Sequence, residues 1–338
     1  MQTLLLEKPG QFNLVDRPEP QTAGAGMALV RVNCAGVCGT DLHAYKGRQP
    51  FFEYPRVLGH ELGVEVLAVG DGVSNVKPGD RCCVEPYLNC GRCIACRRGR
   101  FNCCTSLKVL GVHTDGGYCS RIVVPAVKLH RSAKLSFDQL ALIETLGIGA
   151  HAVSRAAIEP GEWVLVLGAG PIGLAVMQFV KAAGGRLIVA DISPQRLEFC
   201  RKQVGADHTV DARQTPLEQV RAITNSDLPT AVFDATGNPQ SMHDAFGYVA
   251  NSGRLVFVGL FQGDVTFRDP EFHRRELTLL ASRNATPADF ARIISLVEAG
   301  SIDTTPWITH RAKLADAAAQ FNVWTDPSSG TIKAMIAI

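Results

Sequence analysis

Four cysteines stand at short spacings between residues 90 and 104. Cys90, Cys93, Cys96 and Cys104 are separated by two, two and seven residues. Four thiolates gathered in this way can close a tetrahedral Zn²⁺ site with no open position, which is the pattern of a structural zinc. The stretch is rich in Arg and Gly and poor in apolar residues, so metal binding would supply the free energy that orders it. A redox dithiol is the alternative, and spacing alone does not exclude Cys103 as a ligand.

A second group of residues combines a thiol, an imidazole and carboxylates. Cys38 precedes His60 and Glu61 by about twenty residues, and Glu144 stands inside the apolar stretch 142–146. Taken singly, a buried Cys or His usually serves packing. Together they offer three protein ligands and one exchangeable position, which is the pattern of a catalytic zinc. A buried acid such as Glu144 needs a partner or a metal.

Residues 168–173, the glycine turn, fit the pattern G-x-G-x-x-G. The turn follows an apolar run and opens a helical stretch, so Gly168, Gly170 and Gly173 suit a pyrophosphate at a helix N-terminus. Asp191 follows Gly173 by 18 residues, where a ribose-binding carboxylate that favours NAD over NADP belongs. Arg196 is close enough to weaken that preference. The alternative is an ordinary helix entry without a ligand.

These residues lie in two regions of different pattern. Residues 1–130 contain short valine-rich runs, such as 27–32, 63–69 and 118–124, which predict a β-barrel-like domain. From about residue 150, apolar runs at 164–167, 186–191, 231–234 and 254–258 alternate with helical stretches, the first at 172–183. This pattern is typical of a parallel sheet covered on both faces. The tail from about 285 predicts two helices and a last strand at 332–336.

Composition excludes several classes of protein. The 338 residues are 46% hydrophobic and 20% charged, which argues against wholesale disorder. A net charge of +2 gives no basic surplus for nucleic acid or an anionic membrane. The first residues show no secretory pattern, so we expect a cytoplasmic protein whose cysteines bind metal rather than form disulfides. The uncharged stretch 163–180 contains the glycine turn, so we expect a strand and a helix rather than a membrane span.

The combined motifs resemble those of the zinc-dependent medium-chain alcohol and polyol dehydrogenases. The matching stretches are 36–41, 59–61, the cysteine cluster and the glycine turn, in the family's order and near its spacing. The resemblance covers essentially the whole chain. Glu144 falls where sorbitol and threonine dehydrogenases carry Glu and other alcohol dehydrogenases carry Cys, which places the chain in the polyol branch.

The resemblance implies an α/β fold in two parts. A GroES-like β-barrel catalytic domain would comprise residues 1–150 and 285–338, with the structural zinc lobe at about 88–106. A Rossmann domain with a doubly wound parallel sheet would comprise residues 151–284 and bind NAD. The family also implies two zinc ions per subunit and a homo-oligomer, a dimer or a tetramer.

The resemblance further implies roles for individual residues. Cys38 and His60 would bind the catalytic zinc, with Glu61 and Glu144 as further candidates that alternate with water. Asp41 would orient His60. Thr40 and His43 would pass the substrate's proton to solvent. Pro171, Ile172 and Gly259 would touch the cofactor. Arg283 would bind a substrate carboxylate, with Arg48 as the second candidate for this role.

Several further stretches resemble those of bacterial sugar-acid dehydrogenases, namely 49–52, 54–61, 111–113, 258–261, 269–273 and 282–287. The implied reaction is the reversible oxidation of a secondary alcohol of a hexonate such as L-galactonate. A neutral polyol such as sorbitol is the alternative substrate. One departure stands out, because Thr145 follows Glu144 where the family carries Pro, and we expect this change to alter the pocket wall.

Two other classes of function remain as alternatives. One is a metabolite-responsive regulatory protein on this scaffold, against which the retention of Cys38, Thr40, His43, His60 and Glu61 argues. The other is a zinc-free quinone reductase of the same fold, which both metal-ligand groups disfavour.

Overall fold

The computed structural model describes residues 1–49 and 52–338, which form two compact units. Residues 1–145 and 286–338 make the first unit, and residues 146–285 make the second. Helix α3 (Phe137–Ala156) carries the chain from one to the other, so the boundary expected after residue 150 falls inside a continuous helix. Pro50 and Phe51, from the stretch 49–52 quoted above, lie outside the described residues.

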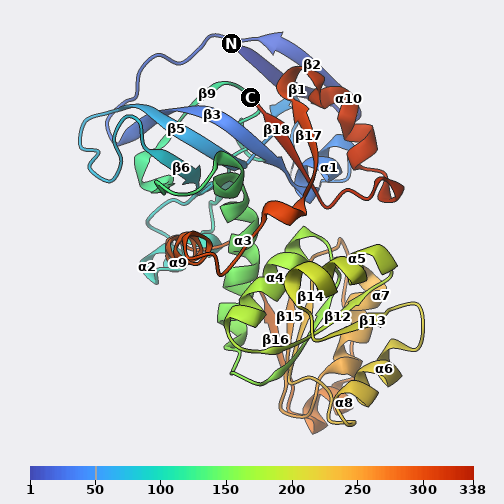
Figure 1. Ribbon diagram of the computed structural model, residues 1–338. Helices are drawn as coiled ribbons and strands as arrows, with labels where there is room; N and C mark the ends of the chain where they lie inside the picture. The colour runs from blue at the N-terminus through green and yellow to red at the C-terminus, as the bar shows by residue number, and fades with distance from the viewer. Residues whose placement is uncertain (50–51) are drawn as a thin grey trace. The chain divides into compact units, whose positions relative to one another are not determined.

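The first unit is built mainly on antiparallel strands, with β17 and β18 paired in parallel (Figure 1). Its larger sheet has the order β10-β6-β5-β3-β18-β17, with β9 also paired to β3, and a smaller sheet has the order β2-β1-β4. The C-terminal strand β18 pairs with β3, which explains why the tail folds with the N-terminal part of the chain. The strands are β1 (Gln2–Lys8), β2 (Gln11–Asp16), β3 (Met27–Val37), β4 (Arg56–Val57), β5 (Glu61–Val69), β6 (Arg81–Val84), β7 (Tyr87–Leu88), β8 (Lys108–Val109), β9 (Arg121–Pro125), β10 (Leu129–Arg131), β17 (Ile308–Lys313) and β18 (Lys333–Ala337).

The helices of the first unit are few and peripheral. They are α1 (Gly39–Tyr45), α2 (Ile94–Arg97), α9 (Pro287–Glu298) and α10 (Leu314–Trp324). Helix α10 buries Leu314, Phe321 and Trp324 in one hydrophobic cluster with residues of β1, β3 and β5. This burial of apolar surface holds the C-terminal segment on the barrel.

The second unit is a six-stranded parallel sheet with the order β13-β12-β11-β14-β15-β16. This is the strand order of a dinucleotide-binding Rossmann fold. Its central strands are continuously buried, as expected for a sheet covered on both faces. The elements are β11 (Trp163–Leu167), α4 (Pro171–Ala182), β12 (Arg186–Asp191), α5 (Pro194–Phe199), β13 (His208–Asp211), α6 (Pro216–Ile223), β14 (Ala231–Asp234), α7 (Pro239–Asp244), β15 (Arg254–Phe257), α8 (Asp269–Arg274) and β16 (Thr278–Ala281).

Most expected elements are present, with two differences. The strand expected at 118–124 begins at Arg121 as β9, because Cys119 instead makes an isolated bridge with Thr3. The tail contains the two expected helices, α9 and α10, but also the strand β17, which the sequence does not predict. In β17 half-buried and exposed residues alternate, and the strand contributes too few apolar residues to stand out.

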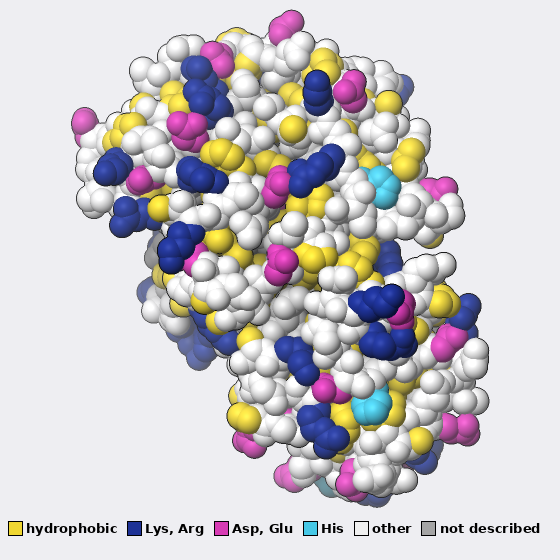
Figure 2. Space-filling model, in the orientation of Figure 1, with side chains coloured by type: hydrophobic (Ala, Val, Ile, Leu, Met, Phe, Trp, Pro, Cys, Tyr) yellow, Lys and Arg dark blue, Asp and Glu magenta, His cyan; other side chains and the backbone are white. Residues whose placement is uncertain are grey.

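Within the described residues, no helix has both the length and the apolar character that crossing a membrane requires. The uncharged stretch 163–180 forms β11, the glycine turn and α4. On the face shown in Figure 2, basic and acidic side chains are interspersed, in keeping with the small net charge.

Candidate catalytic and metal centres

Two paired strands bring Cys38, His60 and Glu61 together, because one strand ends just before Cys38 and the other begins at Glu61. Cys38 follows β3 directly and caps α1, and His60 immediately precedes β5, which starts at Glu61. Because β3 and β5 are antiparallel and Gly36 lies opposite Glu61, the two segments meet at one place. The candidate ligand atoms of Cys38, His60 and Glu61 lie within 4.8 Å of one another. A Cβ at Gly36 would lie 2.0 Å from Glu61 Oε2, so a glycine is needed there to accommodate the carboxylate.

The surroundings of His60 favour a cation. Burial alone would lower the pKa of His60, but electrostatic interaction with the Cys38 and Asp41 side chains raises it well above its ordinary value. His60 Nδ1 and Asp41 Oδ1 are 3.7 Å apart, too far for a hydrogen bond, and neither has such a partner among the described residues. Asp41 Oδ2 instead accepts from the Cys38 N–H (2.8 Å) and the Tyr118 hydroxyl (3.1 Å). This set of S, N and O donors fits zinc.

Glu61 is held by a buried lysine. Lys333 Nζ at the start of β18 donates to Glu61 Oε1 (2.7 Å) and Oε2 (2.9 Å), and both side chains are 1% exposed. Burial would lower the pKa of Lys333, but the attraction of Glu61 raises it overall, so the ammonium stays charged. The Thr145 hydroxyl also donates to Glu61 Oε1, at 2.8 Å. Thr145, expected to alter a pocket wall, therefore contacts Glu61.

Glu144 occupies a separate buried position in α3. It is absent from the ligand group of Cys38, His60 and Glu61 found among the described residues, although it interacts electrostatically with His60. Its Oε1 accepts a 2.5 Å hydrogen bond from the hydroxyl of Tyr87, which is 2% exposed. Burial raises the pKa of Glu144, and repulsion from Glu61 adds to this. Burial also raises the pKa of Tyr87 well above its ordinary value, so the phenol remains a donor.

The expected proton path begins on α1. Thr40 is half-buried and His43 is exposed, so this one short helix connects the Cys38 end to solvent. Burial, with Arg48 and Lys46 nearby, lowers the pKa of His43, which keeps the imidazole neutral and able to accept a proton near neutral pH. Arg48 is exposed beyond the end of the helix.

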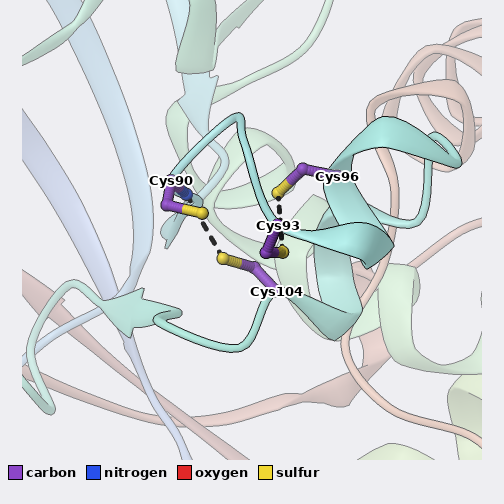
Figure 3. A group of neighbouring side chains, drawn as sticks. All are labelled: Cys90, Cys93, Cys96 and Cys104. Carbon is purple, nitrogen blue, oxygen red and sulfur yellow. Dashed lines mark hydrogen bonds between the residues drawn. The ribbon is translucent and has the colours of Figure 1, made fainter.

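The four cysteines of the lobe at 88–106 point their sulfurs toward one another (Figure 3). All four ligand atoms lie within 4.8 Å. Cys104 Sγ accepts from the backbone N–H groups of Cys90 (3.2 Å) and Ser106 (3.4 Å), and Cys93 Sγ lies 3.5 Å from Cys96 Sγ. A closed set of four sulfurs fits a structural zinc and leaves no position for a substrate.

Backbone donors favour thiolates in this lobe. N–H groups of Cys96 and Thr105 lower the pKa of Cys93 to about 5. Burial and the hydrogen bond with Cys93 raise the pKa of Cys96 to about 11, so the pair retains a proton at neutral pH that a metal would displace. Cys103, which spacing left open as a ligand, is exposed and outside the group of four.

The remaining cysteines are packing residues in the structure. None of the eleven cysteines, all within the described part of the chain, forms a disulfide. Burial raises the pKa of Cys82 and Cys200 to about 12 and that of Cys119 to about 11, so these groups remain thiols. Cys34 Sγ donates to Asp138 Oδ1 at 3.0 Å.

The glycine turn of the second unit has space for a ligand. Gly168 has a φ of +95°, and a Cβ at Gly173 would lie 1.9 Å from Gly168 O, so the fold itself requires these two glycines. A Cβ at Gly170 would meet only Arg196 Nη1, at 3.7 Å. No close protein atom requires a glycine there, and approach of a pyrophosphate is the physical reason that remains. Pro171 and Ile172 begin α4, whose N-terminus suits phosphate.

Asp191 ends β12 beside this turn. Its Oδ2 accepts from the Ala169 N–H (2.6 Å) and its Oδ1 from the Ser193 N–H (2.8 Å), which fixes the carboxylate at the carboxyl edge of the sheet. Gly259 follows β15, and a Cβ there would lie 2.4 Å from Gly237 N, so close loop packing already requires this glycine. Arg283 is exposed just beyond β16 and belongs to this unit.

A cavity of about 1300 Å³ in the second unit is not the nucleotide site. Thr230 directly precedes β14 and Leu277 directly precedes β16, so the cavity lies at the amino ends of the strands. Rossmann ligands bind at the carboxyl ends. The arginines and acids that line the cavity are equal in number, so it has no excess of positive charge for a phosphate. The arginines are Arg221, Arg268, Arg274 and Arg275, and the acids are Glu218, Asp227, Asp244 and Glu271.

Comparison with known proteins decides the family. Residues 24–134 match the alcohol dehydrogenase GroES-like domain, and residues 171–299 match the zinc-binding dehydrogenase family. L-galactonate-5-dehydrogenase of Escherichia coli (strain K12) is 42% identical over 318 residues, which cover 94% of this chain and 93% of that protein. The chain belongs to the zinc-dependent alcohol dehydrogenases.

A polyol dehydrogenase and a solved alcohol dehydrogenase structure are also similar to this alcohol dehydrogenase. Sorbitol dehydrogenase of Bacillus subtilis (strain 168) is 34% identical over 299 residues, 85% of this chain and 83% of that protein. The crystal structure of the alcohol dehydrogenase RspB from E. coli CFT073, complexed with NADH, has a TM-score of 0.94 and 33% identity, and the match covers 100% of this chain and 99% of that one. The fold expected from the motifs is thereby confirmed.

The sequence interpretation of this alcohol dehydrogenase missed Lys333 and Tyr87. A lysine within the apolar run 332–336 was a signal for a buried charge, because an unpaired ammonium is costly inside a β-strand. Tyr87 stands three residues before Cys90, where nothing in the sequence indicates its hydrogen bond to Glu144.

We expect Asp191→Ser to lower kcat/KM for NAD⁺ about 10- to 100-fold, because a hydrogen bond to a charged group contributes about 1.5–3 kcal/mol. The ratio of kcat/KM for NADP⁺ to that for NAD⁺ should rise, since the serine does not repel a 2′-phosphate. Steady-state kinetics with both cofactors measures this. Asp207→Ser is the control, because Asp207 also accepts a backbone N–H beside the same strand, from Leu187, but at its opposite end. An unchanged ratio in Asp191→Ser would refute the assignment.

Proposed function

We propose that this alcohol dehydrogenase reversibly oxidises a secondary alcohol of a sugar acid, a hexonate such as L-galactonate, with NAD⁺ as the hydride acceptor. The observation that carries the proposal is the 42% identity to L-galactonate-5-dehydrogenase along almost the whole length of both chains. The enzyme is NAD-linked and zinc-dependent, in line with its family and with the NADH-bound RspB structure. A neutral polyol is the second candidate, because sorbitol dehydrogenase is also a relative.

In this proposal, Cys38, His60 and Glu61 hold the catalytic zinc, and Glu144, which interacts electrostatically with His60, is the further candidate ligand. The four lobe cysteines hold the structural zinc. When bound, the catalytic zinc lowers the pKa of the substrate hydroxyl, and NAD⁺ accepts the hydride. Lys333 supplies a fixed positive charge that offsets the carboxylates of Glu61, Glu144 and Asp41 around the centre.

The chain's own groups move the proton. The Thr40 hydroxyl accepts it from the substrate as it gives up its own proton toward His43, and His43 Nδ1 or Nε2 passes that proton to solvent from the exposed face of α1. The glycine turn binds the pyrophosphate, and Asp191 binds the ribose hydroxyls. Arg283 or Arg48 pairs with the substrate carboxylate, for which a guanidinium offers two parallel donors. We expect a homo-oligomer in the cytoplasm, a dimer or a tetramer.

A substrate panel tests this function. NAD⁺ reduction is measured with several hexonates and neutral polyols, and zinc content is measured on the same sample. We expect the hexonates to have the higher kcat/KM, because an arginine–carboxylate pair contributes binding that a polyol lacks. Turnover of a polyol such as sorbitol without turnover of any hexonate would contradict the sugar-acid proposal and support the second candidate.

A further inference from the structure

The strand that opens the four-cysteine lobe also contacts the buried acid Glu144. Strand β7 contains only Tyr87 and Leu88, and Tyr87 donates the 2.5 Å hydrogen bond to Glu144 Oε1. Both side chains are buried, at 2% and 5% exposure. The orientation of this acid therefore depends on a phenol that belongs to the lobe.

The lobe holds Tyr87 through its own closing ladder. Tyr87 pairs with Val109 and Leu88 with Lys108, and the Leu110 N–H donates to Pro86 O at 3.0 Å. These contacts close the loop 89–107, which contains all four ligand cysteines. A two-residue ladder is marginal by itself. A zinc ion held by the four cysteines would order the loop that this ladder closes, and would thereby help to keep β7 in place.

The Tyr87 ring is packed independently of its hydroxyl. Phe290 of α9, which is fully buried, contacts it edge-on at 6.3 Å between ring centroids, and His130 stacks on Phe290 at 4.8 Å. Removal of the hydroxyl alone therefore leaves the aromatic packing intact. Tyr87→Phe is consequently a clean test of the hydrogen bond.

We propose that Tyr87 is the positioning residue that holds Glu144 at the catalytic metal centre, and that the four-cysteine lobe controls this centre through Tyr87. The inference rests on the proposed assignment of the catalytic zinc. It gives the lobe a role in the active site in addition to stabilising the fold. Partners that orient metal-site carboxylates typically change metal affinity about 10- to 100-fold when they are removed.

The first experiment measures metal retention in the holoenzyme. Zinc loss to a chelator is followed in wild type, Tyr87→Phe and the control Tyr45→Phe. Tyr45 is also a buried tyrosine of the first unit, and its hydroxyl donates to Asn322 Oδ1 at 3.0 Å, away from Glu144. We expect Tyr87→Phe to bind the more weakly held zinc about 10- to 100-fold less tightly and Tyr45→Phe to match wild type. Equal zinc retention in all three would overturn the proposal.

Two further variants identify the cause. Glu144→Gln should remove the effect, so that Tyr87→Phe causes no additional loss in that background; a full additional loss would show that Tyr87 acts elsewhere. Cys38→Ser should abolish the weakly held zinc, and its retention would refute the catalytic-zinc assignment itself rather than the role of Tyr87. Failure of the Tyr87 proposal and failure of the catalytic-zinc assignment therefore give different results.

The lobe's part is tested with Cys93→Ser, which removes one of its four sulfurs. The catalytic zinc is replaced with Co²⁺, and its d–d absorption reports the ligand geometry. We expect the band of the catalytic centre to shift in Cys93→Ser as it does in Tyr87→Phe, with no further shift in the double variant. If the band is unchanged in Cys93→Ser while the lobe metal is lost, the control by the lobe is refuted.

Discussion

Replacement of Lys333 by methionine is expected to lower the free energy of unfolding by about 3–5 kcal/mol, because it leaves the Glu61 carboxylate buried without its counter-charge. Lys333 donates to both oxygens of Glu61 and, at 3.3 Å, to Val37 O. Methionine has a similar length but cannot donate. Urea unfolding measures the loss, with the buried Trp307 and Trp324 reporting on the first unit by fluorescence.

The double variant Lys333→Met with Glu61→Gln separates charge from packing. It should recover a large part of the lost stability, since the unpaired buried charge is then absent. Lys181→Met is the control, because Lys181 and Asp207 form a partly exposed pair at 3.0 Å that should contribute no more than about 1 kcal/mol. A Lys333→Met effect as small as that of Lys181→Met would contradict the buried-pair argument.

The two groups of candidate metal donors could be located from the sequence because residue type and spacing restrict them strongly. The lobe cysteines lie within 15 residues of one another, so a compact loop of this length brings their side chains close together. Cys38 and His60 are farther apart, but the antiparallel pairing of β3 with β5 brings their segments together. Local sequence therefore contained most of the information for the lobe, whereas the Cys38 group also depends on strand pairing.

The partners of the two acids could not be predicted in this way. Lys333 is 272 residues from Glu61, and the contact exists because β18 adds to the edge of β3. Thr145 was noticed as a departure from the family pattern, but only the direction of α3 shows that its hydroxyl meets Glu61. Tyr87 depends on β7 pairing with β8 around the lobe. Such contacts follow from tertiary packing, which spacing does not report.

Burial patterns explain which strands could be predicted from the sequence and which could not. Strands of the parallel sheet are continuously apolar, so β12 and β14 were located to the residue. Strand β17 was not predicted, because its side chains are alternately half-buried and exposed and it pairs at the sheet edge with β18. Helix α3 spans the change of pattern at residue 150 because a single helix can serve two cores in succession.

Cys38→Ser is expected to lower kcat/KM on the order of 10³-fold, because polarisation of the substrate hydroxyl by the metal contributes several kcal/mol and each 1.36 kcal/mol is tenfold in rate. Serine is similar in size but is a much poorer ligand for zinc than a thiolate. Cys34→Ser is the matched control: Cys34 lies on β3, the strand that Cys38 directly follows, and a serine there can still donate to Asp138. Kinetics with NAD⁺ and zinc content on the same samples should show loss of activity and of one zinc only in Cys38→Ser. Full activity in Cys38→Ser would remove Cys38 from the catalytic centre and with it the central step of the proposed chemistry.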